Sequence, residues 1–111
     1  MENNNNSKKI AELNDNFRKN WSDGKVLMTR GVVYIKDKIR IELVKQVVHF
    51  DNFTEDNDPY GEHDFGAITI EGKKFFWKID YYDNSMKSGS EDPSNPDITK
   101  RVLTMMLAEE Y

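Results

Sequence analysis

The chain has 111 residues, 37% hydrophobic and 32% charged, which suffices for one modest core and not for two. It contains no cysteine, so disulfides, thiolate metal sites and cysteine nucleophiles are excluded. No apolar run approaches the roughly 20 residues that span a membrane, and no signal-peptide pattern begins the chain, so we expect a cytoplasmic location.

The net charge of −4 is unevenly distributed. Residues 1–50 carry ten Lys and Arg against six Asp and Glu, whereas residues 51–111 carry six against fourteen. Because phosphate backbones need clustered cations, the acidic half argues against direct nucleic-acid binding and favours a basic protein partner. Ordinary charge for solubility is the alternative reading.

The first residues, Met1 to Asn6, are polar and have nothing to bury, so they predict a disordered lead before a single globular domain over residues 7–111. Ser7 can cap a helix that runs to about Asn20. Ser22-Asp23-Gly24 would end it. Its apolar positions follow helical spacing: Ile10, Leu13 and Phe17.

Lys25 to Thr29 is rich in strand-forming residues and predicts a short strand. Asp37 to Phe50 has apolar residues at helical spacing and no internal turn signal, which predicts a helix, although its β-branched residues would also suit a strand. Asp51 to Asp64 then forms a long polar connection that bends at Pro59 and Gly61.

Phe65 to Ile70 and Lys74 to Tyr82 predict a β-hairpin joined through Glu71-Gly72-Lys73. In the second strand, alternate residues share a face. One face is apolar and should meet the helices: Phe75, Trp77, Ile79 and Tyr81. The other is mixed and could line a site: Phe76, Lys78, Asp80 and Tyr82.

Asn95 followed by Pro96 is typical of a helix start, and Val102, Met105 and Met106 give a helical stripe after it. The predicted order is therefore α-β-α-β-β-α. We expect an α+β fold with a small, mostly antiparallel sheet of about three strands and about three helices.

Asp51 to Asp64 holds six carboxylates and one histidine. Like charges this close repel one another, so such a cluster indicates a turn, a metal site, a binding site for a cationic partner or a catalytic site. Glu62, His63 and Asp64 offer metal-ligand types, but in an extended chain the middle side chain points away from its neighbours. A turn capped by Asp and Asn side chains is the simpler interpretation, and no cofactor is indicated.

A catalytic interpretation pairs His63 with Asp64 or Asp80 for proton transfer near neutral pH. The chain, however, shows no nucleophile elbow, zinc-protease helix or phosphate loop. Lys78, between Asp80 and Glu62, would instead form an ion pair that ties the hairpin to the acidic loop.

The residues that we expect to bind a partner are polar or aromatic and come from the acidic loop and the mixed hairpin face. They are Glu55, Asp56, Asp58, Tyr60, Glu62, Lys78 and Tyr82.

Four strings carry a family resemblance: MTRGV (28–32), FDNFTEDNDPYGEHDFGAI (50–68), FFWKIDYYD (75–83) and RVLTMMLAEEY (101–111). They resemble a small bacterial domain family of unknown function that is common in proteobacterial genomes and on plasmids and other mobile elements. The similarity runs from about Ile10 to Tyr111, with departures in the Asn-rich lead and between Tyr34 and Ile41. The resemblance implies no assigned activity.

The function expected from the sequence is a small, non-enzymatic protein-interaction domain that works through the acidic loop and the mixed hairpin face. Occurrence of the resembled family on mobile elements implies a role in conflict between host and element, such as inhibition of a basic protein. The alternative is a small enzyme or metal-binding domain centred on His63.

Overall fold

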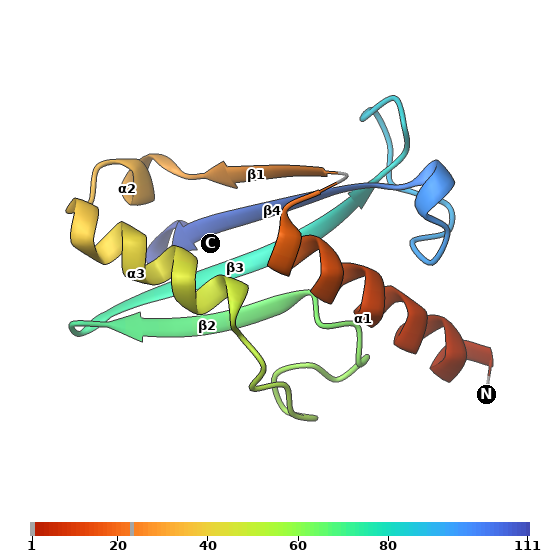
Figure 1. Ribbon diagram of the computed structural model, residues 1–111, viewed down its shortest axis with the longest axis horizontal. Coiled ribbons are helices and arrows are strands. Elements are labelled where there is room, and N and C mark those ends of the chain that lie inside the picture. The colour runs from red at the N-terminus through yellow and green to blue at the C-terminus, as the bar shows by residue number, and fades with distance from the viewer. Residues whose placement is uncertain (1, 23) are drawn as a thin grey trace.

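The computed structural model describes the backbone of residues 2–22 and 24–111 and the side chains of residues 6–22 and 24–111. Its elements follow the order α-β-α-α-β-β-β, with two short 3-10 turns near the end of the chain (Figure 1). They are α1 (Glu2–Asn20), β1 (Gly24–Met28), α2 (Arg30–Val33), α3 (Asp37–Val48), β2 (Phe65–Ile70), β3 (Lys73–Tyr82), η1 (Pro96–Ile98), β4 (Lys100–Leu107) and η2 (Ala108–Glu110).

The four strands form one mixed sheet in the order β1-β4-β3-β2. β1 runs parallel to β4, whereas β4, β3 and β2 are antiparallel neighbours. The turn of the β2–β3 hairpin consists of Glu71 and Gly72, whose φ angles are +50° and +81°. Two consecutive positive φ angles match the twist of the flanking strands, as in the common two-residue hairpin turns. The predicted hairpin is confirmed.

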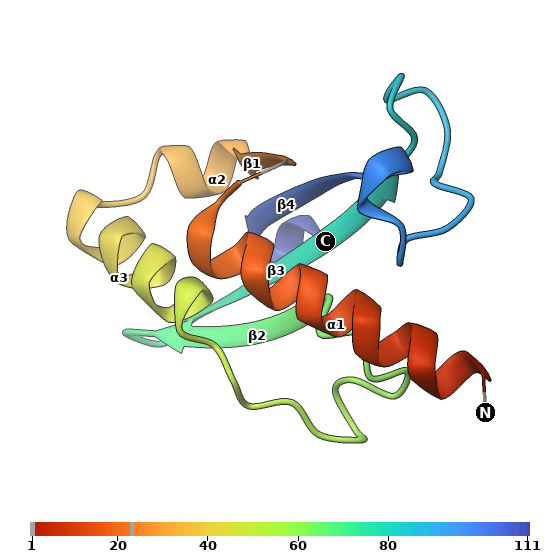
Figure 2. The same cartoon turned by 45° about the vertical axis from the view of Figure 1, so that its right-hand side comes forward.

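The hydrophobic core lies between one face of the sheet and helices α1 and α3, which cross it (Figures 1 and 2). Trp77 is fully buried at its centre, as the alternation along β3 predicts. The core includes Phe17, Leu43, Val47, Phe75, Trp77, Leu103 and Met105. The first five are residues that the predicted helical and strand periodicities place inward, whereas Leu103 and Met105 lie on β4.

The α+β class is confirmed, but the C-terminal helix is wrong, because residues 100–107 form β4 and only Pro96–Ile98 makes a single 3-10 turn. Asn95 does cap that turn, since its side chain accepts a hydrogen bond from Asp97 N at 3.0 Å. β4 is a central strand with apolar residues on both faces. Such a run lacks alternation and mimics a helical stripe.

The N-terminal helix begins earlier than predicted. α1 starts at Glu2, so the stretch predicted as a disordered lead is helical from that residue on, and Met1 lies outside the described residues. Asp23, part of the predicted stop signal, also lies outside them. Across the described ranges, no helix combines the length and apolarity that crossing a bilayer requires.

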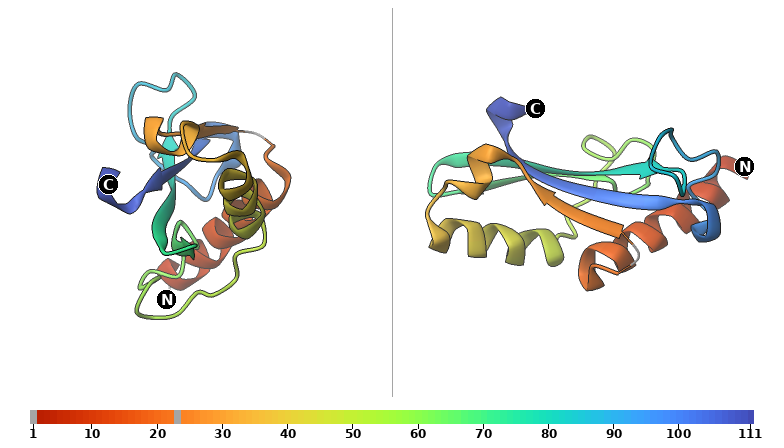
Figure 3. Two further views of the ribbon diagram at one scale, coloured as in Figure 1. Left: turned by 90° about the vertical axis from the view of Figure 1, so that its left-hand side faces the viewer. Right: turned by 90° about the horizontal axis from the view of Figure 1, so that it is seen from above.

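The second face of the sheet has no helix over it in the described part of the chain. Seen from above, α1 and α3 lie on one side of the strands, and the C-terminal turn η2 rises from the other side (Figure 3). We call this second side the open sheet face. Its strand residues follow from the register: Lys25, Leu27, Phe65, Ala67, Thr69, Lys74, Phe76, Lys78, Asp80, Tyr82, Lys100, Val102, Thr104 and Met106.

Candidate functional site

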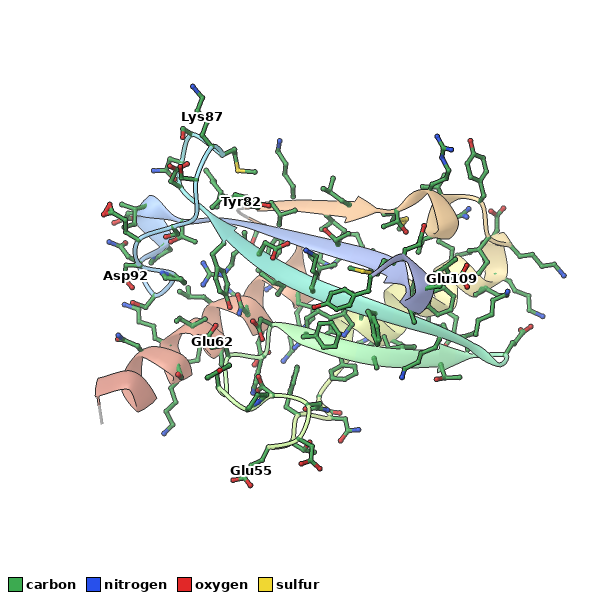
Figure 4. The ribbon with its side chains drawn as sticks, turned by 180° about the vertical axis from the view of Figure 1, so that it is seen from behind. Glu55, Glu62, Tyr82, Lys87, Asp92 and Glu109 are labelled. Carbon is green, nitrogen blue, oxygen red and sulfur yellow. The ribbon has the colours of Figure 1, made fainter. Side chains whose placement is uncertain are left out.

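The acidic loop, Asp51 to Asp64, is held by the side-chain caps that the sequence predicts. Asn57 accepts a hydrogen bond from Thr54 N at 2.8 Å and donates one to Asn52 O at 2.8 Å. Within this frame Glu55, Asp56 and Tyr60 point outward, and Tyr60 is 79% exposed. With Asp51, which is also exposed, the loop presents three carboxylates and one aromatic ring, and Figure 4 shows Glu55 pointing away from the sheet.

Asp58 faces inward and caps the loop. Its carboxylate accepts hydrogen bonds from Glu62 N and His63 N, each at 3.2 Å, and the residue is 8% exposed. A buried carboxylate needs such donors, because it loses water as a partner. Asp58 therefore stabilises the loop, although the sequence placed it with the exposed binding residues.

His63 is fixed on every side. Its φ of +57° lies in the left-handed region, which is unfavourable for a residue with a side chain. Nδ1 lies 3.0 Å from both carboxylate oxygens of Asp15, and Nε2 lies 3.8 Å from Asp58 Oδ2. The ring stacks on Phe53 with centroids 3.9 Å apart. These contacts hold a strained backbone and leave the imidazole engaged with structural partners.

Asp15 connects the histidine to the core through Arg18. The Asp15 carboxylate lies 2.7 Å from Arg18 Nη2, and Arg18 Nη1 donates to Val47 O and Phe50 O at 2.9 Å each. Arg18 is 1% exposed; the Asp15 carboxylate balances its charge, and carbonyl groups at and just beyond the end of α3 accept its hydrogen bonds. The His63 cluster thus joins α1, the acidic loop and the C-terminal end of α3.

Glu62 belongs to a second buried network. Tyr81 Oη donates to Glu62 Oε1 at 2.9 Å, and Asn14 Nδ2 donates to Tyr81 Oη at 2.8 Å and to Glu62 O at 2.9 Å. Arg101 Nε donates to Asn14 Oδ1 at 2.6 Å. Burial raises the pKa of Tyr81 and lowers that of Arg101. The network holds the start of the hairpin against α1.

The side chains proposed for catalysis or metal binding meet different partners. His63 contacts Asp15, Glu62 contacts Tyr81, and Asp80 pairs with Lys78 at 2.8 Å. Burial, followed by the charge of Glu62, raises the pKa of Asp64. Among the residues that the structure describes, no three His, Asp or Glu side chains are arranged to hold a metal ion.

Lys78 lies on the open sheet face, where its ion pair with Asp80 joins two residues of the same strand. The hydrogen bond to Asp80 raises the pKa of Lys78. The expected tie between this lysine and the acidic loop is therefore replaced by a pair within β3. Tyr82 follows on the same face and is half-buried.

Three aromatic rings gather at one end of the open sheet face. Phe65 and Phe76 lie with ring centroids 5.0 Å apart, and Tyr111 packs 5.7 Å from the first and 5.5 Å from the second. Tyr111 is 74% exposed, and both phenylalanines are half-buried. Lys74 Nζ lies 5.4 Å from the centroid of the Phe76 ring.

Glu110 positions Tyr111 over this cluster. Its carboxylate accepts hydrogen bonds from Thr29 Oγ1 at 2.5 Å, Gly31 N at 2.9 Å and Leu107 N at 2.8 Å. These bonds, with that from Thr29 first, lower the pKa of Glu110 and anchor η2 to the start of α2. The last turn of the described chain is therefore fixed in place.

The opposite end of the face is basic. Lys25 and Lys100 line a solvent-open cavity of about 210 Å³ together with Gly24, Met86 and Arg101. Both lysines are exposed. Counting the strand residues alone, the open sheet face carries four lysines and one aspartate, although the whole chain has a net charge of −4.

The predicted binding residues are therefore divided among three places: the exposed acidic loop, the buried networks and the open sheet face. Among the charged and aromatic residues of this face, the sequence did not single out Lys25, Phe65, Lys74 and Lys100, nor Tyr111, which packs on the face from beyond η2. Strand alternation places Phe76 and Lys78 together, but only the position of β4 between β1 and β3 brings Lys25 and Lys100 to the same face.

A family model described as "Protein of unknown function (DUF3768)" matches residues 28–110. The match takes in nearly all of the four strings that carry the resemblance. No curated protein and no solved structure matches the chain.

Proposed function

The chain belongs to the DUF3768 family, whose description names no activity, and we propose that it is a non-enzymatic binding domain whose open sheet face takes a negatively charged partner. The observation that carries the proposal is the four-to-one excess of lysine over aspartate on the strands of that face. Opposite charges on two surfaces accelerate their association and disfavour wrong partners.

The composition of the face supports the proposal further. Aromatic residues are enriched at binding hot spots, and Tyr111 combines high exposure with a fixed position. Glu109 and Glu110 on η2 are exposed carboxylates, so the four lysines of the strands stand against three carboxylates when η2 and Asp80 are counted together. The proposal therefore concerns the strands, with the aromatic cluster at one end and the basic cavity at the other.

The expected basic partner of the acidic loop stays a separate prediction. Glu55, Asp56 and Tyr60 are the exposed residues that such a partner would contact. The implied role in conflict between a host and a mobile element also stays a prediction, because it rests on the resemblance and on no contact in the fold.

Catalysis at His63 has less support than binding. Both ring nitrogens of His63 face carboxylates that themselves hold structural hydrogen bonds, and the ring is stacked on Phe53. These contacts support a structural role for His63, which connects α1 to the acidic loop through Asp15.

Site-specific photocrosslinking in cells tests the proposed function. A photoreactive amino acid replaces exposed Thr69 on the open sheet face or, as the control, exposed Ile41 on α3. We expect adducts from position 69 that disappear when Lys25, Lys74 and Lys100 are all changed to Glu. Equal adducts from position 41, or adducts at position 69 that survive the charge reversal, would contradict the proposal.

A further inference from the structure

We infer that the open sheet face binds single-stranded nucleic acid, with its aromatic rings stacking on bases and its lysines contacting phosphates. The inference rests on the proposed function, because it names the class of the negatively charged partner. It departs from the expectation drawn from overall charge, which argues against direct nucleic-acid binding.

Flat aromatic rings beside lysines distinguish this class of partner from an acidic peptide. Stacking on aromatic side chains is the main sequence-tolerant contact with unpaired bases, since every base has a π-face. Tyr111 offers an exposed ring, and the half-buried rings of Phe76 and Phe65 contact it at interplanar angles of 79° and 57°. An acidic peptide would use the lysines and could pack on the rings, but only unpaired bases stack on them face to face.

The cations are placed along a path that begins at the rings. Lys74 lies beside the Phe76 ring. Lys78 is two residues beyond Phe76 on the same face of β3. Tyr82 is six residues beyond Phe76, about 20 Å along a strand, and its cross-strand partner is Lys100 at the basic cavity. A backbone that starts at the aromatic cluster therefore meets Lys74 at one end and Lys25 and Lys100 at the other, with Lys78 between them paired to Asp80.

The shape of the face favours a single strand over a duplex. Four strands about 4.8 Å apart make a surface about 14 Å wide, and the major groove of B-DNA is about 12 Å wide. A whole sheet face of that width does not enter the groove, and its rings would meet no unstacked base in a duplex. Unpaired bases, by contrast, can lie flat on it.

The acidic character of the whole chain does not prevent this binding. The body measures 42 × 31 × 23 Å. Because the Debye length is about 8 Å at physiological ionic strength, carboxylates on the opposite side are largely screened from a ligand on the open sheet face. The local lysines then determine the attraction.

The test is fluorescence anisotropy of a labelled 12-residue oligothymidylate titrated with the full chain at several salt concentrations. Three or four neutralised phosphates predict a slope of about −2 to −3 in a plot of log affinity against log salt. Tyr111→Ala should weaken binding about tenfold, within the range found for loss of one base-stacking ring. Changing Lys25, Lys74 and Lys100 together to Gln should weaken binding and flatten the slope.

The matched control changes three exposed lysines on the helical side, Lys9, Lys19 and Lys45, to Gln, and its affinity should equal that of the parent. Duplex DNA of the same length and polyglutamate should compete poorly. No binding at 50 mM salt, an equal loss in the control, or equal competition by polyglutamate would overturn the inference. Photocrosslinks at Thr69 that resist nuclease would overturn the inference while leaving the proposed function intact, whereas absence of crosslinks there would remove both.

Discussion

Arg101 Nε on β4 donates a hydrogen bond of 2.6 Å to Asn14 Oδ1 on α1, joining residues 87 positions apart in the chain. The amide group of the same Asn14 donates to Tyr81 Oη and to Glu62 O. One fully buried carboxamide therefore connects the first helix, the centre of the sheet and the end of the acidic loop.

Asn14→Leu should lower the free energy of unfolding by about 3 kcal/mol, because it removes the acceptor of buried Arg101 Nε and the hydrogen bond that Tyr81 Oη accepts. Arg101 keeps its bond to Pro93 O, and Tyr81 keeps its bond to Glu62. The measurement is urea denaturation at neutral pH. Asn20→Leu is the control, since Asn20 is exposed and bonds only within α1. Equal midpoints for the two variants would contradict the network as described.

Trp77→Ala should cost about 3–5 kcal/mol, as truncation of a large buried aromatic side chain does. Trp77 is fully buried, whereas Tyr60 is 79% exposed and serves as the control. Tyr60→Ala should change stability by less than about 0.5 kcal/mol. A Trp77 variant that melts with the parent would show that the hairpin register is displaced by one residue.

Asp58→Ala should destabilise the fold by about 1–3 kcal/mol, because two backbone N–H groups lose a charged acceptor. Neutralising the exposed Glu55 and Asp56 together should leave stability unchanged. Thermal melts of the two variants compare the stability lost with the Asp58 cap with the stability lost by removing exposed negative charge. If both behave like the parent, the loop is held by something other than Asp58.

The pH dependence of the free energy of unfolding should reveal the raised pKa of Asp64. Burial raises its pKa in the folded state above the value of 3.8 expected in the unfolded chain. The folded state then binds more protons between those two values, so this group makes stability fall as pH rises through that window. Asp64→Asn should therefore be more stable than the parent at pH 7, and the advantage should shrink as pH falls from the raised pKa of Asp64 towards 3.8 and be absent below that value.

Asp83 gives a control of opposite sign. A hydrogen bond from Ser85 Oγ lowers the pKa of Asp83, so its ionised form is favoured in the folded state. Asp83→Asn should not stabilise the protein at pH 7. A stabilising effect of both substitutions would point to general relief of negative charge and not to the burial of Asp64.

The sequence predicts the hairpin and the burial of Trp77, because the strands alternate and a turn signal joins them. It also predicts a helix from Asp37 to Phe50, which the structure confirms as α3 with an end at Val48. β4 is mistaken for a helix because a central strand buries both of its faces, here through Leu103 and Met105 on one side and Val102 and Met106 on the other. Local pattern does not contain the information that β1 and β3 flank it.

The candidate site shows the same limit. Phe76, Lys78 and Tyr82 can be assigned to one face from alternation alone, and the acidic loop is visible as a run of charge. Which carboxylates turn inward depends on tertiary partners: Asp58 caps two N–H groups and Glu62 meets Tyr81. The basic character of the open sheet face likewise appears only when Lys25 and Lys100 are brought beside β3.

Amide chemical-shift mapping with unlabelled oligothymidylate reports where on the fold the ligand binds. If the open sheet face is the binding site, we expect salt-sensitive shifts in β3, β4 and the C-terminal turn, with the largest around Phe76, Lys78 and Tyr111. Shifts confined to α1, α3 or the acidic loop, or an unchanged spectrum at 50 mM salt, would contradict it.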